Sequence, residues 1–229
     1  MRLLVCFLLT TFLASVLFAE ERTPATTSKK VAALIDQLAS PNPPPTFPGG
    51  EKNGGPDYIL PAGFSRAKQM HVYEACHQLK TLGPLAFPYL IKSWNDKRHS
   101  MTLSVGINGY CFNASVGEIC ERIIFDQLQP YGTLPEFDDD PRGKPHRPSY
   151  PAQFLATPKD AGKWYEEHKN KTLFEMQLMI VEWVIEQESK SPTNFLEKEH
   201  KEVRRIRDQL KKAAKPIDRG NYYSEDTEA

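Results

Sequence analysis

Clusters of proline and glycine divide this chain into helix-length pieces and constrain its fold more than any other feature. The densest cluster is residues 41–64, PNPPPTFPGGEKNGGPDYILPAGF, and another lies within residues 130–156. Proline lacks an amide hydrogen and fixes its φ angle, so it interrupts helices and sheet ladders alike. The pieces between the clusters place apolar residues at intervals of three and four, which is typical of amphipathic helices. We therefore expect an all-α fold with long irregular loops.

Local signals predict where these helices begin and end. Residues typical of helix N-caps precede the helical segments, and they are Ser28, Ser65, Ser115, Thr157, Thr172 and Asn194. The expected helices cover residues 29–39, 65–82, 84–94, 115–129, 157–168, 172–188 and 194–214. Gly83 is expected to end one helix in the left-handed conformation, and Pro88 to bend the start of the next.

Two further patterns concern the core and the loops. Residues 173–188 are apolar nearly all round, so we expect them to form the central buried helix, where Trp183→Ala would cost about 3–5 kcal/mol if the side chain is fully buried. The segments 102–105 and 110–112 are expected to pair as a short hairpin around Asn108-Gly109. The Pro- and Gly-rich loop 41–64 is expected to lack regular structure. Its apolar residues should pin it to the helical body; they are Phe47, Tyr58, Ile59, Leu60 and Phe64.

One stretch carries a repeat pattern. Leu82-Gly83, Ala86, Pro88 and Leu90 follow one another as Leu-Gly, Ala, Pro, Leu, and an earlier segment ends in Leu34-Ile35-x-x-Leu38. This pattern resembles the turn and second helix of HEAT-type repeats, a family related to the armadillo repeats. The resemblance implies an irregular α-α superhelix, a HEAT-like helical array that presents a surface to a protein partner and has no catalytic residues. The loop 41–64 departs from the short turns that join HEAT units.

The N-terminus has the pattern of an export signal. Arg2 precedes an apolar run from Leu3 to Phe18, and polar residues begin at Glu20. We expect a signal peptide at residues 1–19, cleaved after Ala19, and a secreted or periplasmic protein. A polar leader (20–28), one helical domain (29–215) and a disordered polar tail (216–229) should follow. The alternative is an uncleaved signal that holds an envelope-associated structural protein at the membrane.

The mature chain would keep three cysteines in an oxidising compartment, which permits disulfides but leaves one thiol over. Cys111 and Cys120 are close in sequence and are predicted to pair. The alternative is that Cys76, Cys111 and Cys120 are all small apolar core residues.

One helix face has residues suited to chemistry. His71, Glu74 and His77 are spaced by three, with Cys76 beside them, so their side chains share one stripe that could bind a metal or orient a base. An exported hydrolase using this stripe is the enzymatic alternative. No serine-hydrolase elbow, phosphate loop, HExxH or CxxC motif is present. We therefore interpret the stripe as an exposed polar face and expect no catalytic residue, metal or cofactor.

The remaining motifs favour ordinary surface roles. Asp138–Asp140 lack the ligand spacing of a calcium loop, because Arg142 stands where an oxygen ligand is needed. Asn113-Ala114-Ser115 and Asn170-Lys171-Thr172 match glycosylation acceptors.

The last helix mixes many Lys and Arg residues with acids, which is typical of a solvated face, although an anionic partner is the alternative. With a net charge of zero, no nucleic-acid partner is expected. We expect an unidentified protein partner and leave the oligomeric state open.

Overall fold

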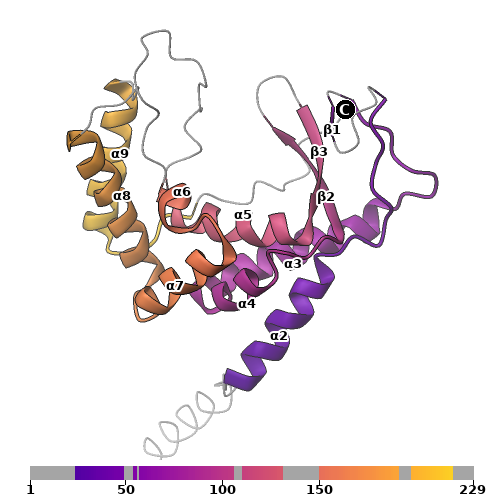
Figure 1. Ribbon diagram of the computed structural model, residues 1–229, viewed down its shortest axis with the longest axis horizontal. Helices are drawn as coiled ribbons and strands as arrows, with labels where there is room; N and C mark the ends of the chain where they lie inside the picture. Colours follow the sequence, from indigo (N-terminus) through magenta and orange to yellow (C-terminus); the bar gives the residue numbers. More distant parts are fainter. Residues whose placement is uncertain are drawn as a thin grey trace, which may run out of the picture.

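The computed structural model describes residues 24–48, 54–55, 57–105, 110–130, 150–190 and 197–218. This part of the chain is predominantly helical, with a small antiparallel sheet in the order β1-β3-β2 (Figure 1). The helices are α2 (Pro24–Gln37), α3 (Arg66–Leu82), α4 (Phe87–Lys92), α5 (Val116–Leu128), α6 (Tyr150–Phe154), α7 (Pro158–His168), α8 (Leu173–Lys190) and α9 (Glu197–Ala213). The strands are β1 (Gly54–Gly55), β2 (His99–Val105) and β3 (Tyr110–Ser115).

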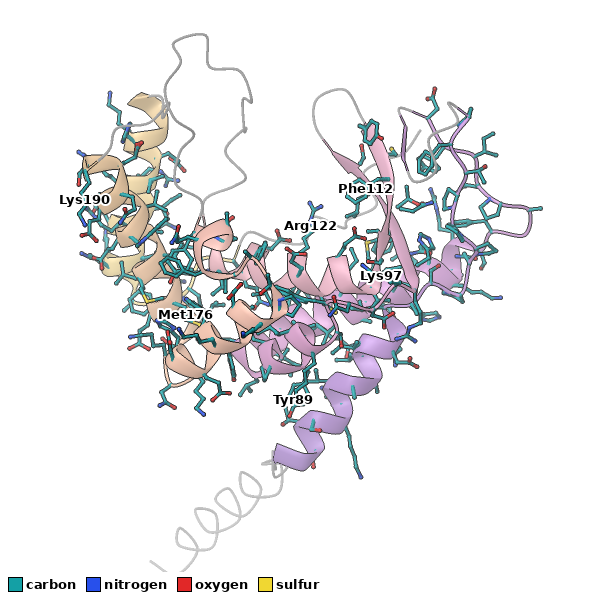
Figure 2. The ribbon with its side chains drawn as sticks, in the orientation of Figure 1. Tyr89, Lys97, Phe112, Arg122, Met176 and Lys190 are labelled. Carbon is teal, nitrogen blue, oxygen red and sulfur yellow. The ribbon has the colours of Figure 1, made fainter. Side chains whose placement is uncertain are left out.

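The arrangement has α5 across the middle (Figure 1). Helices α3 and α4 pack against it, the strands rise at one end, and α8 and α9 stand at the other. Figure 2 shows Arg122 of α5 pointing to the side on which the strands and α8 rise, and Tyr89 of α4 on the opposite side. The predicted all-α class is therefore right for most of the described chain, and the sheet is an addition to it.

The predicted helix starts are mostly confirmed. Ser65, Ser115 and Thr157 each accept a hydrogen bond from the backbone N–H three residues on, and Thr172 accepts one from Glu175. These caps supply partners to amides that a helix leaves unpaired at its start. The prediction for Ser28 is wrong, because α2 begins at Pro24 and includes part of the expected leader. Asn194 lies outside the described residues.

The turn between α3 and α4 follows the predicted pattern in part at Gly83 and not at Pro88. Gly83 ends α3 as expected, and its N–H donates to the carbonyl of Lys80. Its φ of +60° is positive, but its ψ of −143° lies outside the predicted left-handed helical conformation, so that part of the prediction is wrong. Residues Gly83–Leu85 form a 3₁₀ turn, and α4 begins only at Phe87. Pro88 therefore lies in the first helical turn, where a backbone N–H would have no intrahelical partner, and it has no cause to bend the helix.

The predicted hairpin is confirmed and is longer than expected. Strands β2 and β3 pair antiparallel from Val105 opposite Tyr110 to His99 opposite Ser115. The expectation that loop 41–64 holds no regular structure is wrong at two positions of β3's partner strand. Gly54 pairs with Phe112 and Gly55 pairs with Cys111. Position 54 favours glycine, because a Cβ there would lie 2.9 Å from the backbone carbonyl oxygen of Cys111 on β3.

Helix α5, rather than α8, is at the centre of the core. It contacts α3, α4, α8 and both strands of the hairpin. Helix α8 packs against α9, α5 and α6 at one end of the molecule, so the prediction of a central helix over residues 173–188 is wrong. Its wide apolar surface is shared among three neighbours, and Trp183 remains half-buried beside Tyr150 and Phe154.

The start of the expected disordered tail is ordered. Residues 216–218 follow α9, and Ile217 packs against the hydrophobic core. A buried glutamine on α8 binds the backbone of Ile217, which no local pattern in the polar tail could indicate. Residues 219–229 lie outside the described part of the chain.

Candidate functional site

The predicted His/Glu stripe lies on the solvent side of α3. His71 Nδ1 is 3.5 Å from Glu74 Oε2, and these side chains are 73% and 63% exposed. His77, one turn further along, is also exposed. Among the described residues, no three His, Cys, Asp or Glu side chains are grouped closely enough to hold a metal ion. The structure thus brings His71 and Glu74 together as an exposed pair, without the enclosure that would tune either group for catalysis.

The three cysteines are buried thiols, and the predicted Cys111–Cys120 disulfide is not formed in the described structure. Cys111 lies on β3, where it pairs with β1 and β2, whereas Cys120 lies on the core side of α5. Burial, and secondarily the charges of Asp96 and Cys76, raise the pKa of the Cys120 thiol to about 12. A buried thiol with a raised pKa is a poor nucleophile, so Cys120 acts as a small core residue.

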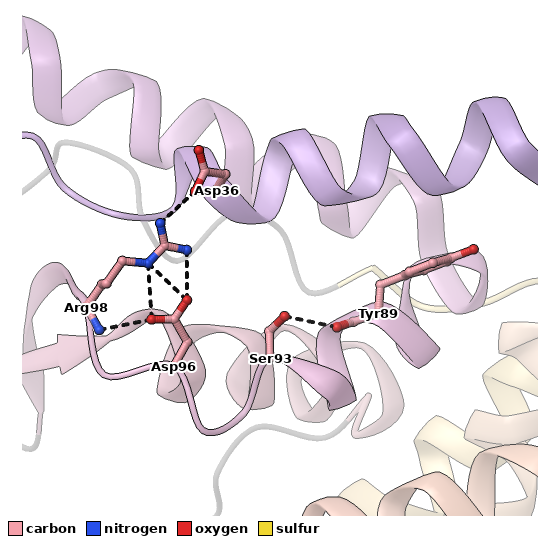
Figure 3. A network of polar contacts seen from close by, with 5 residues as sticks. All are labelled: Asp36, Tyr89, Ser93, Asp96 and Arg98. Carbon is pink, nitrogen blue, oxygen red and sulfur yellow. Dashed lines mark hydrogen bonds and ion pairs between the residues drawn. The ribbon is translucent and has the colours of Figure 1, made fainter.

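An arginine hub that the sequence analysis missed joins α2 to the start of β2 (Figure 3). The Arg98 guanidinium lies 2.6 Å from Asp36 Oδ1 and 2.8 Å from Asp96 Oδ2. The Arg98 backbone N–H also donates to Asp96 Oδ1 at 3.0 Å. Hydrogen bonds from Arg98 lower the pKa of the Asp96 carboxyl. Both carboxylates are already engaged by one exposed arginine, so the hub is a structural joint.

The hub also fixes the start of α5. The Val116 N–H donates to the carbonyl of Arg98 at 2.8 Å, and the Gly117 N–H donates to the carbonyl of Asp96 at 2.9 Å. The next amide, of Glu118, donates to Ser115 Oγ at 3.3 Å. These bonds occupy the first three amides of the helix, which leaves them unavailable to an anionic ligand.

A cluster of buried side-chain amides holds the loop 41–64 against the helical body. Asn42 is 5% exposed; its Oδ1 accepts from the Ser65 N–H at 2.9 Å, and its Nδ2 donates to the Ser65 carbonyl at 3.0 Å. Gln69 is 6% exposed, and its Nε2 donates to the Ser100 carbonyl at 3.0 Å. Ser40 Oγ donates to Gln69 Oε1 at 2.8 Å and completes the cluster. The Asn42 amide therefore connects the two ends of the loop.

Further contacts fix the middle of this loop. The Thr46 N–H donates to the Ile59 carbonyl at 3.1 Å, and the Ile59 N–H donates back at 2.8 Å. Asn113 of β3 donates from Nδ2 to the carbonyl of Pro45 at 2.8 Å. The described part of the loop is thus hydrogen-bonded both to itself and to the sheet, and within that part Gly54 and Gly55 form a strand.

This fixed loop presents a run of apolar side chains to solvent. Tyr58, Ile59 and Leu60 are 46%, 58% and 48% exposed. The prediction that they pin the loop is wrong, although Phe47 is buried as expected and Phe64 is half-buried. Hydrogen bonds made by Asn42 and Thr46 hold the loop instead, and the three side chains face outward. We call residues 58–60 the apolar rim.

The charged last helix uses its apolar stripe for packing. Val203, Ile206 and Leu210 are buried, and α9 packs against α8. Several of its cations have acidic partners: Arg205 with Glu202, Arg207 with Asp208, and Lys211 with Glu182. Positive charge on this face is therefore partly neutralised within the protein, as expected for a solvated helix.

The two glycosylation triplets differ in access. Asn113 is committed to Pro45 and accepts from Thr102 Oγ1 at 2.9 Å, whereas Asn170 is exposed after α7. The acidic loop at Asp138–Asp140 lies outside the described residues.

The described helices include none that combines the length and apolar composition needed to cross a membrane. The expected signal segment, residues 1–19, lies outside this part of the chain. No family model matches this chain, and no curated protein or solved structure matches it either.

Proposed function

We propose that this chain is an exported, HEAT-like helical protein that binds another protein and has no catalytic activity of its own. The observation that carries the proposal is the apolar rim: three consecutive apolar side chains, 46–58% exposed, on a loop whose backbone is fixed. Contiguous exposed apolar surface is costly in water and commonly marks a site of protein association.

The fixed backbone matters because a loose loop would turn such side chains inward. Ile59 engages both its N–H and its C=O with Thr46, so rotating its side chain into the core would break two hydrogen bonds. A surface that is already ordered loses little conformational entropy when a partner binds. Tyr58 adds an aromatic ring with a hydroxyl, a type of side chain that is enriched at protein interfaces.

The residue that precedes the rim in the chain, Asp57, is charged and exposed. Charged and polar residues at the edge of an apolar centre are common in non-obligate interfaces. An export signal, predicted at residues 1–19, would put the proposed partner in the periplasm or outside the cell.

A pair of matched variants tests the proposal. Ile59→Asp puts a charge in the rim. The control, Leu85→Asp, puts a charge on the 3₁₀ turn, outside the rim, at a side chain of similar exposure (Ile59 is 58% and Leu85 54% exposed). A photo-crosslinking amino acid at Tyr58 in the exporting cell should capture a defined protein partner. We expect Ile59→Asp to lower that partner's affinity at least tenfold and Leu85→Asp to leave it within about twofold, since a buried interfacial charge costs several kcal/mol.

The outcome is decided by the difference between the two variants. Equal binding by both, or equal loss in both, would show that the rim is not the contact surface. A Tyr58 crosslink that forms only within the chain would likewise contradict the proposal.

A further inference from the structure

Helices α3 and α5 pack against each other, and their first turns lie at the same end of the contact. In the first turn of α3, Gln69 donates from Nε2 to the Ser100 carbonyl of β2 at 3.0 Å. The residue before Ser100, His99, pairs with Ser115, which is the N-cap of α5. The start of β2 therefore joins the beginnings of both helices.

The last turns of the two helices also lie together. Lys80 Nζ of α3 is 3.2 Å from Asp126 Oδ2 of α5, and both side chains are largely buried (12% and 17% exposed). Directly after α3, a Cβ on Gly83 would lie 3.9 Å from Gln127 Oε1. The two helices therefore run in the same direction, and the approach of Gly83 to Gln127 sets their register at this end.

Two cysteines occupy matching positions further back along this register. Cys76 precedes Gly83 by seven residues, and Cys120 precedes Gln127 by seven residues. Seven residues are about two turns of an α-helix, so each cysteine shares a face with the residue that marks the register. Both side chains are 0% exposed and belong to one hydrophobic core. The register therefore places the two thiols opposite each other between α3 and α5.

The charge interaction between the two thiols supports this placement. After burial and Asp96, Cys76 is a further group that raises the pKa of the Cys120 thiol. A charge on one sulfur disfavours a charge on the other only where the two groups are close together. Cys111 lies on β3, between β1 and β2, so it belongs to the sheet rather than to the contact of the two helices.

We propose that Cys76 and Cys120 form a disulfide that links α3 to α5 when the chain folds in the presence of a disulfide oxidant. The structure is that of the dithiol form. A bridge requires Cα atoms within about 7 Å of each other, so its formation tests the register of the two helices directly. The compartment expected for an exported chain supplies the oxidant. The bridge is independent of the function proposed for the apolar rim.

The reaction belongs to the folding of the chain, because in the folded protein burial makes the Cys120 thiol a poor nucleophile. One cysteine thiolate attacks a sulfur of oxidised glutathione, which releases one reduced glutathione and leaves a mixed disulfide. As α3 and α5 close, the second thiolate attacks the protein sulfur of the mixed disulfide and releases the second glutathione. The protein loses two electrons and two protons, and the disulfide of the oxidant becomes two thiols.

Refolding of the full chain with glutathione tests this proposal. Denatured and reduced wild-type protein is refolded with reduced and oxidised glutathione, the remaining thiols are alkylated, and the product is digested without reduction. The digestion uses trypsin and a glutamate-specific protease, because cleavage after Glu118 separates Cys111 from Cys120. We expect one linked pair of peptides, which joins Cys76 to Cys120, and an alkylated Cys111. Three alkylated thiols, a glutathione adduct without a link, or a link to Cys111 would overturn the proposal.

Thermal unfolding of the oxidised and reduced proteins gives a second measurement. A bridge that fits the folded helices restricts the unfolded chain between residues 76 and 120, so the oxidised protein should have a Tm at least about 5 °C higher. Cys111→Ala is the matched control and should keep this difference, whereas Cys76→Ala should remove it. If oxidation leaves the Tm of the wild type unchanged or lowers it, the helices must distort to form the bridge and the proposed register is wrong.

Discussion

At the scale of single residues, Gly117 is the glycine of the described chain whose surroundings leave the least room for a side chain. A Cβ at this position would overlap the backbone carbonyl of Trp94 and lie 3.1 Å from the carbonyl oxygen of Asp96. The Asp96 carbonyl is held in place because it accepts the Gly117 N–H, and the Trp94 carbonyl belongs to the backbone two residues earlier. The absent side chain therefore allows the start of α5 to approach the segment before β2.

We predict that Gly117→Ala lowers the free energy of unfolding by about 3 kcal/mol or more, because overpacking against backbone is poorly relieved. Gly162 in α7 is the matched control, since a Cβ there meets nothing within 4 Å. Gly162→Ala should stabilise the protein by about 0.5–1 kcal/mol, the usual gain of alanine over glycine in a helix. Urea denaturation of both variants measures the difference, and equal effects would contradict this account of α5.

His99, at the start of β2, gives stability a pH dependence. Burial lowers the pKa of His99 below its ordinary value of 6.5, and a hydrogen bond with the Ala114 backbone offsets part of this effect. The unfolded chain therefore binds a proton more readily than the folded protein between the two pKa values. Stability should fall as the pH drops below about 6.5, and it should level off below the folded-state pKa.

The measurement is the free energy of unfolding at pH 7.5 and at pH 5.5. We expect the wild type to lose stability between these values and His99→Gln, which does not titrate in this range, to lose less. Identical pH profiles for the two proteins would assign the dependence to other groups.

At the scale of elements, α5 and α8 have exchanged the roles that their sequences suggest. The α8 segment is the more apolar one, yet its surface is divided among α5, α6 and α9, and Trp183 stays half-buried. Ile123 of α5 is 0% exposed within the shared core. Apolar composition shows that a helix has neighbours to pack against but not where in the molecule those neighbours place it.

We predict that Ile123→Ala costs about 3–4 kcal/mol and Trp183→Ala about 2 kcal/mol, because only the first removes a fully buried side chain. Trp183 still loses edge-to-face contacts with Tyr150 and Phe154, whose ring centroids lie 5.1 and 5.6 Å away. Thermal and urea unfolding of the two variants tests the ranking. A larger loss of stability for Trp183→Ala than for Ile123→Ala would contradict the assignment of α5 to the centre of the core.

The sequence predicted the ends of elements better than their placement. Caps at Ser65, Ser115 and Thr172 were predictable because a cap and the amide it satisfies lie within one turn. The hairpin was predictable for a similar reason, since the turn and the alternating strands are contiguous. The hydrogen bonds of Asn42 with Ser65 and of Gln177 with Ile217 join segments 23 and 40 residues apart, and no local pattern indicates such pairs.

At the scale of the whole molecule, the candidate surface depends on those long-range contacts. The apolar residues of loop 41–64 are evident in the sequence, but their composition does not reveal which way the backbone directs their side chains. The helix face shared by His71, Glu74 and His77 is evident from their spacing, and in the structure all three side chains are exposed. Whether such a side chain is exposed or buried depends on which distant segments of the chain pack over it, and a local pattern does not show this.

One property of Asn42, which binds the backbone of Ser65, concerns the lifetime of the protein rather than its stability. Asparagine side chains age by deamidation, in which the backbone nitrogen of the next residue attacks the side-chain carbonyl and closes a succinimide ring. The residue after Asn42 is Pro43, whose nitrogen carries no hydrogen and cannot complete that ring closure. Conversion to aspartate would set a negative charge against the Ser65 carbonyl that Asn42 Nδ2 now binds. Pro43 therefore protects from this reaction the side chain that joins the two ends of the loop.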